Sequence, residues 1–290
     1  MHACTSNLLW ICKRAFLTSC SVRTDHKHVA PASTHPSRPS FNTLEDMLSN
    51  TIEASGTDYI TARKKTLARD GYRCMLTGCF DTNSCSRNVE LAALRGDDAD
   101  AEVQTCHILN KSALYNLEDL PEDRAGTPAR DHAAGVMAIL TQFGLEQLVD
   151  ELIQKGGIHS LRNLLSLISP LHLPFDRLDL WFDETDEENV YQVQVARPNI
   201  LKLFAYVNRR PHFAVDETIK KVNFRSAHLA LPDPRLLALH AVCARVAHMS
   251  GAAEYFYELE RDAEDTTVIT EDSLHLLNNL LSPFTVVSAY

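Results

Sequence analysis

Two histidines and one carboxylate have the residue types that metal-assisted hydrolysis uses. His172 and Asp176 are four positions apart, so a helix would place both on one face, where an imidazole nitrogen and a carboxylate oxygen could bind the same divalent cation. His107 lies 65 positions earlier than His172. A neutral imidazole is suited to remove a proton from water near neutral pH. These three residues are therefore the candidate chemical groups of the chain, provided that the fold brings them together.

The segments that carry these residues have the patterns of two strands and a helix. Residues 103–109 form a strand-like run that contains the candidate base. Residues 158–168 predict a turn followed by a strand, and they contain Asn163. A helix is expected from 169 to 182, and it carries both residues of the candidate cation site. The order is strand, strand, helix.

With these motifs in place, the sequence resembles the HNH endonucleases, and most of all the fungal proteins that carry a variant HNH domain. The resemblance covers roughly residues 58–210, and residues 231–251 resemble the C-terminal helix of those fungal chains. The matching positions are Arg69–Cys74 with Thr77–Gly78, then Cys106–Ile108, then Asn163 and His172 nine positions apart, then Phe175–Asp176.

The resemblance implies an α+β fold with a ββα-metal finger at its core, embedded in a helix-rich domain with a long C-terminal helix. It gives His107 the role of general base, and Asn163 the role of orienting that imidazole through a hydrogen bond. His172, with Asp176 as a second ligand, would bind magnesium, manganese or zinc. The implied reaction is hydrolysis of phosphodiester bonds in nucleic acid, which we expect to be DNA.

Cys106 departs from the family pattern. Many of these nucleases have a metal ligand at the position before the general base, and a thiolate suits zinc far better than magnesium. Cys106 is therefore either a zinc ligand or a small buried side chain. A separate zinc site at Cys74, Cys79 and Cys85 is a weaker alternative, because their spacing lacks two close cysteine pairs.

A basic segment could contact the phosphate backbone. Residues 197–225 contain seven basic residues against two acidic ones, whereas the whole chain has a net charge of −10. Such a stripe would bind nucleic acid without sequence preference, although an ordinary solvated face has the same composition. The seven basic residues are Arg197, Lys202, Arg209, Arg210, Lys220, Lys221 and Arg225.

The chain divides by composition into three parts. Residues 1–41 are rich in serine, basic and poor in acids, which is typical both of a disordered tail and of a mitochondrial presequence. We expect a nuclease-like domain over 42–216 and a helical extension with an acidic tail over 217–290. The 290 residues contain no apolar run long enough to span a membrane, and eight cysteines without a secretory signal indicate an intracellular protein of the nucleus, cytoplasm or mitochondrion.

Apolar periodicity predicts further elements. Helices are expected from 42 and from 57, the second ending at Asp70–Gly71, and longer ones over 131–155 and 234–262. Strands are expected over 73–77 and 191–195.

Two interpretations remain open. The first is an active endonuclease. The second is an inactive module of HNH fold that binds nucleic acid or protein, which Cys106 and the acidic composition favour. His132 and His159 have no partner at ligand spacing and are expected to be surface residues.

Overall fold

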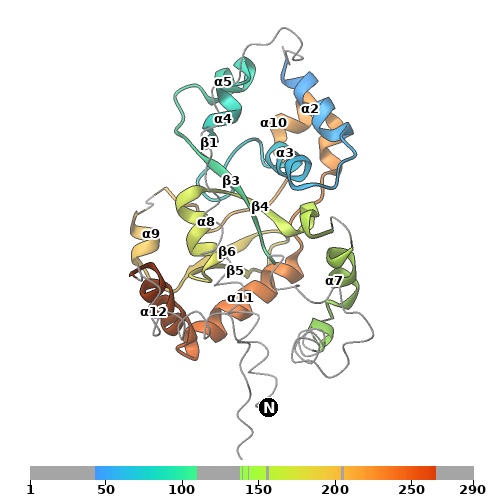
Figure 1. The fold of residues 1–290 in the computed structure, drawn as a ribbon. Coiled ribbons are helices and arrows are strands. Elements are labelled where there is room, and N and C mark those ends of the chain that lie inside the picture. Colours follow the sequence, from blue (N-terminus) through green and yellow to red (C-terminus); the bar gives the residue numbers. More distant parts are fainter. Residues whose placement is uncertain are drawn as a thin grey trace, which may run out of the picture.

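The computed structural model describes residues 43–109, 138, 140–142, 144–154, 157–203 and 206–265. The protein has a mixed α+β fold in which short two-stranded sheets lie among helices (Figure 1). None of the described helices is long and apolar enough to cross a membrane. The predicted tail over 1–41 lies outside the described residues, and so do residues 266–290 at the other end of the chain.

Two helices open the described chain, as the sequence predicts. Helix α2 (Leu44–Glu53) begins at Thr43, whose hydroxyl accepts the Asp46 N–H at 3.1 Å. Helix α3 (Tyr59–Arg69) begins at Asp58, whose carboxylate accepts two backbone N–H groups. Gly71 ends α3 with a φ of +68°, and a Cβ at this position would lie 2.6 Å from the Asp216 carboxyl carbon. Glycine is therefore required there by both conformation and space.

Short elements follow α3. The predicted strand over 73–77 is wrong, because these residues form a turn in which the Gly78 N–H bonds the Cys74 carbonyl at 2.9 Å. The elements that follow are β1 (Phe80–Asp81), α4 (Thr82–Cys85), α5 (Val89–Arg95) and β2 (Asp100–Ala101), which pairs with β1 in parallel.

An antiparallel pair of strands and the helix after it form the centre of the fold. Strand β3 (Val103–His107) pairs with β4 (Leu164–Ile168) from Val103 opposite Ile168 to His107 opposite Leu164. Helix α8 (Ser169–Asp176) follows β4 directly and packs on both strands. Every residue of β4 is buried.

Helix α8 is shorter than predicted. It ends at Asp176, because Leu178 has a φ of 61° and the Asp179 N–H bonds the Pro174 carbonyl at 2.8 Å. Residues that had been expected to continue the helix form β5 (Leu180–Glu184), which pairs in antiparallel register with β6 (Tyr191–Val195). The prediction of a strand over 191–195 is confirmed.

The predicted helix over 131–155 is interrupted where it is described. Gly144 has a φ of 67°, and α7 (Glu146–Ile153) begins only after it. Two short 3-10 turns then lead into β4, namely η2 (Gly157–His159) and η3 (Leu161–Asn163).

The C-terminal part is helical and shares the core of the rest. Helix α11 packs on β5, and one apolar cluster extends from Leu44 to Ala253. The predicted helix over 234–262 is divided at Gly251, which has a φ of 73°. The elements of this part are α9 (Asn199–Leu203), α10 (Glu217–Val222), η4 (Phe224–His228), α11 (Pro234–Met249) and α12 (Ala252–Asp265).

A buried ion pair joins three segments of this core. The Arg69 side chain is 0% exposed and binds the Asp70 carboxylate through Nε at 2.6 Å and Nη2 at 2.9 Å. Its Nη1 also donates to the carbonyls of Leu161 at 2.9 Å and Ala230 at 3.1 Å, and Nη2 to that of Leu164 at 2.9 Å. The guanidinium thus fixes the start of β4 relative to α3.

Candidate active site

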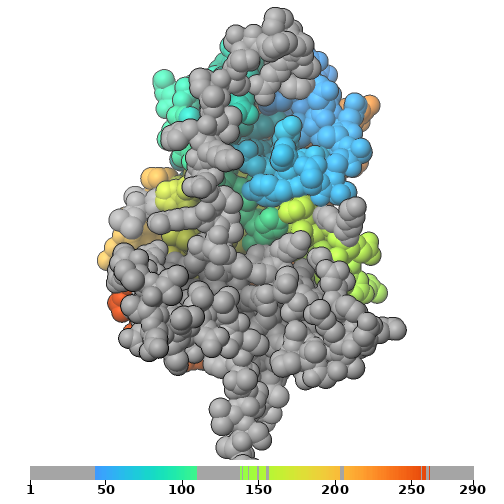
Figure 2. Space-filling model, in the orientation of Figure 1, coloured from blue at the N-terminus to red at the C-terminus, as the bar shows by residue number. Residues whose placement is uncertain are grey.

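His107 lies at the end of β3, beside helix α3. The edge of β3 that faces away from β4 is covered by α3, whose Tyr59 hydroxyl donates to the Thr105 carbonyl at 3.1 Å and whose Arg63 donates to the Val103 carbonyl at 3.3 Å. The Tyr59 ring stacks on that of His107, with centroids 5.9 Å apart and 27° between the planes. Figure 2 shows α2 and α3 in blue at the surface above green and yellow-green segments.

The partner of the His107 ring is another histidine. Nε2 of His107 lies 3.0 Å from Nδ1 of His159, which belongs to η2. The pKa of His107 is lowered from 6.5 to about 4, mainly by burial, and the neighbouring His159 and His172 contribute in the same direction. His107 is therefore neutral at pH 7, and a neutral imidazole keeps the nitrogen lone pair that a general base needs.

Asn163 is completely buried and binds backbone, not an imidazole. Its carboxamide accepts the Leu109 N–H at 2.8 Å and donates to the Leu109 carbonyl at 2.7 Å and to the Ile158 carbonyl at 3.1 Å. The expected hydrogen bond from Asn163 to the His107 ring is thus a wrong prediction. Asn163 instead forms hydrogen bonds with the backbone of Leu109, after His107, and of Ile158, before His159.

His172 and Asp176 share one face of α8, as their spacing predicts. Nε2 of His172 lies 3.0 Å from Oδ2 of Asp176. On the other side of the ring, Nδ1 lies 2.8 Å from Oε1 of Gln104, which belongs to β3. Both side chains are partly exposed, at 24% for His172 and 28% for Asp176. Solvent and a ligand can therefore reach this pair.

The two halves of the site share strand β3. Gln104 and His107 belong to one strand, and α8 packs against that strand. His172 acts electrostatically on His107. Burial raises the pKa of Tyr59, Arg63 opposes that rise, and Asp176 makes the smallest contribution. Helix α3, strand β3, η2 and helix α8 thus contribute to one region.

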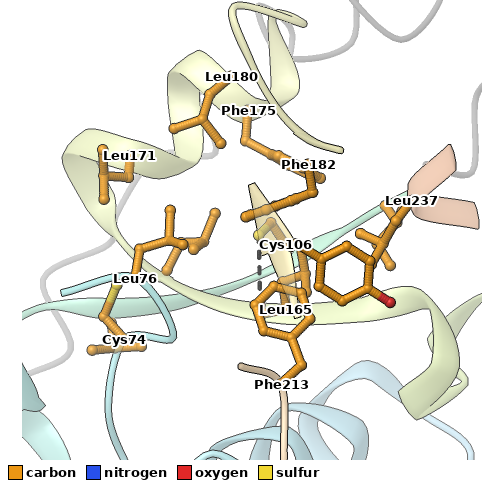
Figure 3. Close-up of a cluster of buried hydrophobic side chains, with 14 of the residues drawn as sticks. Cys74, Leu76, Cys106, Leu165, Leu171, Phe175, Leu180, Phe182, Phe213 and Leu237 are labelled. Carbon is orange, nitrogen blue, oxygen red and sulfur yellow. Dashed lines mark hydrogen bonds between the residues drawn. The ribbon is translucent and has the colours of Figure 1, made fainter. Parts of the chain in front are cut away.

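Cys106 points into the apolar core. Its side chain is 1% exposed and lies among Leu165, Phe182 and their neighbours (Figure 3), with Sγ 3.5 Å from the Leu165 carbonyl. Burial raises the pKa of the thiol well above its usual value, so the thiol stays protonated and is a poor ligand. This position contradicts the metal-ligand role for Cys106 and agrees with a small buried side chain.

The three cysteines of the alternative zinc site form no metal site in the described part of the chain. Cys74, Cys79 and Cys85 are free and buried. Within the described ranges, no three histidine, cysteine or acidic side chains are placed to hold a metal ion together. The pair on α8 is therefore a partial ligand set, which water or substrate oxygen would complete.

The basic segment does not form one stripe. Arg197 lies near α9 and pairs with the buried Asp179 at 2.7 Å, whereas α10 lies beside α2 and α3 in another part of the molecule (Figure 1). Arg210 pairs with Glu187, Lys220 with Glu217 and Arg225 with Glu53. Lys202, Arg209 and Lys221 are exposed and form no ion pair with a described acid.

Several site residues were not predicted from the sequence. His159 is expected at the surface from the sequence, and Tyr59, Arg63 and Gln104 have no predicted role in the site. The i, i+4 spacing of Tyr59 and Arg63 on a predicted helix could have indicated a shared face. Gln104 lies three positions before His107 on a strand, and no local pattern connects it to α8.

Comparison with known proteins gave no match: no protein-family model matches the chain, and no curated protein or solved structure matches it.

Proposed function

We propose that the protein is a metal-dependent endonuclease of HNH type, which hydrolyses phosphodiester bonds in nucleic acid, with DNA as the expected substrate. In this proposal β3, β4 and α8 form the ββα-metal finger. One observation supports it above the others. His107 and His172 are 65 positions apart, yet β3 and α8 pack together and His172 bonds Gln104 of the strand that His107 ends.

The residues on α8 fit a hard divalent cation with few protein ligands. Because Gln104 Oε1 can only accept, Nδ1 of His172 carries the proton, and Nε2 can then present a lone pair beside the Asp176 carboxylate. A second hydrogen-bond partner of this kind fixes the tautomer of metal-binding histidines. When bound, magnesium or manganese, with zinc as the third candidate, would supply positive charge to the scissile phosphate.

The chain's own groups then have separate tasks. The neutral His107 removes a proton from the attacking water. Asn163 holds the backbone on both sides of the site through Leu109 and Ile158. Arg63, bound to the Val103 carbonyl, adds a positive charge beside the strand.

The test is nicking of supercoiled plasmid by the full chain with magnesium, manganese or zinc. We expect His107→Ala to lower the rate by at least about 100-fold, the usual contribution of a general base. His228→Ala, an exposed histidine on η4, is the matched control and should keep the wild-type rate. Wild-type protein that remains inert with all three metals would overturn the proposal.

The second candidate is an inactive module that binds nucleic acid or protein. It is favoured by the buried position of Cys106 where many of these nucleases have a ligand, and by the acidic chain. Elemental analysis separates the two: near-stoichiometric metal that is lost in His172→Ala supports the enzyme, whereas a folded protein that never binds metal supports the module.

A further inference from the structure

The His107–His159 pair contains a proton whose position determines what His107 can do. Nε2 of His107 and Nδ1 of His159 are 3.0 Å apart, and the ring planes are tilted by 53°. In a hydrogen bond between two imidazole nitrogens, one ring donates an N–H and the other accepts with a lone pair. The Tyr59 ring lies against both, with centroids 5.9 Å from His107 and 5.6 Å from His159.

The two possible arrangements have opposite consequences. If His107 accepts, its Nε2 lone pair is used in the bond and its Nδ1 carries a hydrogen. If His107 donates through Nε2–H, its Nδ1 has a free lone pair and can act as a base. Among the residues that the structure describes, Nε2 of His107 bonds His159 and Nδ1 forms no hydrogen bond, so Nδ1 is the candidate acceptor of the proton from water.

Resting on the proposed nuclease activity, we propose that His159 is a positioning residue that accepts the Nε2–H of His107 and so fixes the tautomer whose Nδ1 takes the proton from water. As the water oxygen bonds to phosphorus, its proton moves to Nδ1 of His107. The phosphorus–oxygen bond to the leaving group breaks, and that oxygen later takes a proton from solvent. The resulting His107 cation keeps its Nε2–H bond to His159.

The backbone that carries His159 is held for this role. The Ile158 carbonyl accepts from the Asn163 carboxamide at 3.1 Å, and the Ser160 N–H bonds the Gly157 carbonyl at 2.8 Å. The same carboxamide binds Leu109, two residues after His107. Both histidines are thus supported by one buried side chain, which fixes their separation before substrate arrives.

The experiment uses full-length protein labelled with ¹⁵N in its histidine rings. Two-bond ¹H–¹⁵N couplings at pH 7.5 report which ring nitrogen carries the proton, and His107→Ala identifies the His107 signals. We compare wild type with His159→Phe, which keeps a ring without an acceptor, and His159→Asn, whose Oδ1 stands where Nδ1 stood. Single-turnover plasmid nicking is measured for the same proteins, and thermal melting confirms that each is folded.

We expect His107 to be the Nε2–H tautomer in wild type and in His159→Asn, and to shift toward Nδ1–H in His159→Phe. The nicking rate of His159→Phe should fall by about 10- to 100-fold, as for other partners that orient a site residue, and His159→Asn should recover most of it. Nδ1–H in wild type, or a His159→Phe rate equal to wild type, would overturn the assignment.

The ring couplings also separate this assignment from the proposed function. If wild-type protein does not nick DNA but shows the Nε2–H tautomer that His159→Phe loses, the nuclease proposal fails while the hydrogen-bond assignment holds. If wild type nicks DNA and the tautomer does not depend on His159, only the positioning role fails. If His159→Phe does not fold, the couplings of wild type and His159→Asn still decide the tautomer.

Discussion

The Asn163 carboxamide bonds both backbone groups of Leu109, accepting its N–H at 2.8 Å and donating to its carbonyl at 2.7 Å. A side-chain amide has the same donor and acceptor as a peptide, so Asn163 extends the β3–β4 pairing by one more step through its side chain. This relationship holds the bend after His107 against the residue that precedes β4.

Asn163→Asp should therefore destabilise the protein strongly while changing its shape little. A carboxylate cannot donate, so the carbonyls of Leu109 and Ile158 lose their partner and a charge is buried. We expect a loss of about 3 kcal/mol or more in the free energy of unfolding, measured in urea. Asn50→Asp, on the exposed side of α2, is the control and should change stability by less than about 0.5 kcal/mol. Equal effects at both positions would contradict this role.

Gln104→Leu should weaken metal binding without touching a ligand. It removes the acceptor that orients Nδ1 of His172, and we expect manganese affinity, measured by isothermal titration calorimetry, to fall by about 10- to 100-fold. Gln194→Leu on β6 provides the matched control. Unchanged affinity in Gln104→Leu, with binding lost in Asp176→Asn, would show that the ring orients without help from Gln104.

Cys106→Ala should leave metal content and plasmid nicking unchanged. The thiol lies in the core and bonds the Leu165 carbonyl, so its removal costs about 1 kcal/mol of stability through a small cavity. Elemental analysis measures the metal content, and urea unfolding measures the loss of stability. If Cys106→Ala lost bound zinc but kept wild-type stability, Cys106 would be a metal ligand and this prediction would be wrong.

Acid should destabilise the protein partly through His240. This ring stacks on Phe175 with centroids 4.0 Å apart, and its Nε2 bonds the Phe175 carbonyl at 3.1 Å. Burial lowers its pKa from 6.5 to about 4. Because the unfolded chain takes up the proton first, stability is full above pH 6.5 and declines as pH falls toward 4, by about 3 kcal/mol for this group.

Urea unfolding at pH 7 and pH 4.5 measures this effect, and His240→Gln should show a smaller difference between the two pH values. His107, whose pKa is lowered in the same direction, contributes with the same sign. An identical pH dependence in wild type and in His240→Gln would contradict the contribution of this ring.

Local patterns predicted the elements whose ends are marked by local chemistry. Helices α2 and α3 begin at capping side chains and β6 alternates with period two, so all three were found. The helix predicted over 169–182 ends earlier and the helix predicted over 234–262 is divided, because Leu178 and Gly251 adopt left-handed conformations that periodicity does not reveal. Spacing alone did predict that His172 and Asp176 share one face of α8.

Residues that depend on distant contacts could not be predicted. His159 meets His107 only because two 3-10 turns return the chain toward the end of β3. Asn163 was found by its place in a motif, but its partners, which are backbone groups, carry no signature in the sequence. Cys106 was ambiguous until its burial was known.

The hydrogen bonds of the Arg69 guanidinium limit the order in which parts of the chain can fold during synthesis. Its hydrogen-bond acceptors include Leu161 and Ala230, which are 92 and 161 residues further along the chain. During synthesis this buried charge must wait for the carbonyl of Ala230, so the region around β4 cannot reach its final state until nearly the whole described chain has left the ribosome. Contacts between such distant residues slow folding, and a nascent chain halted before α11 would keep Arg69 hydrated.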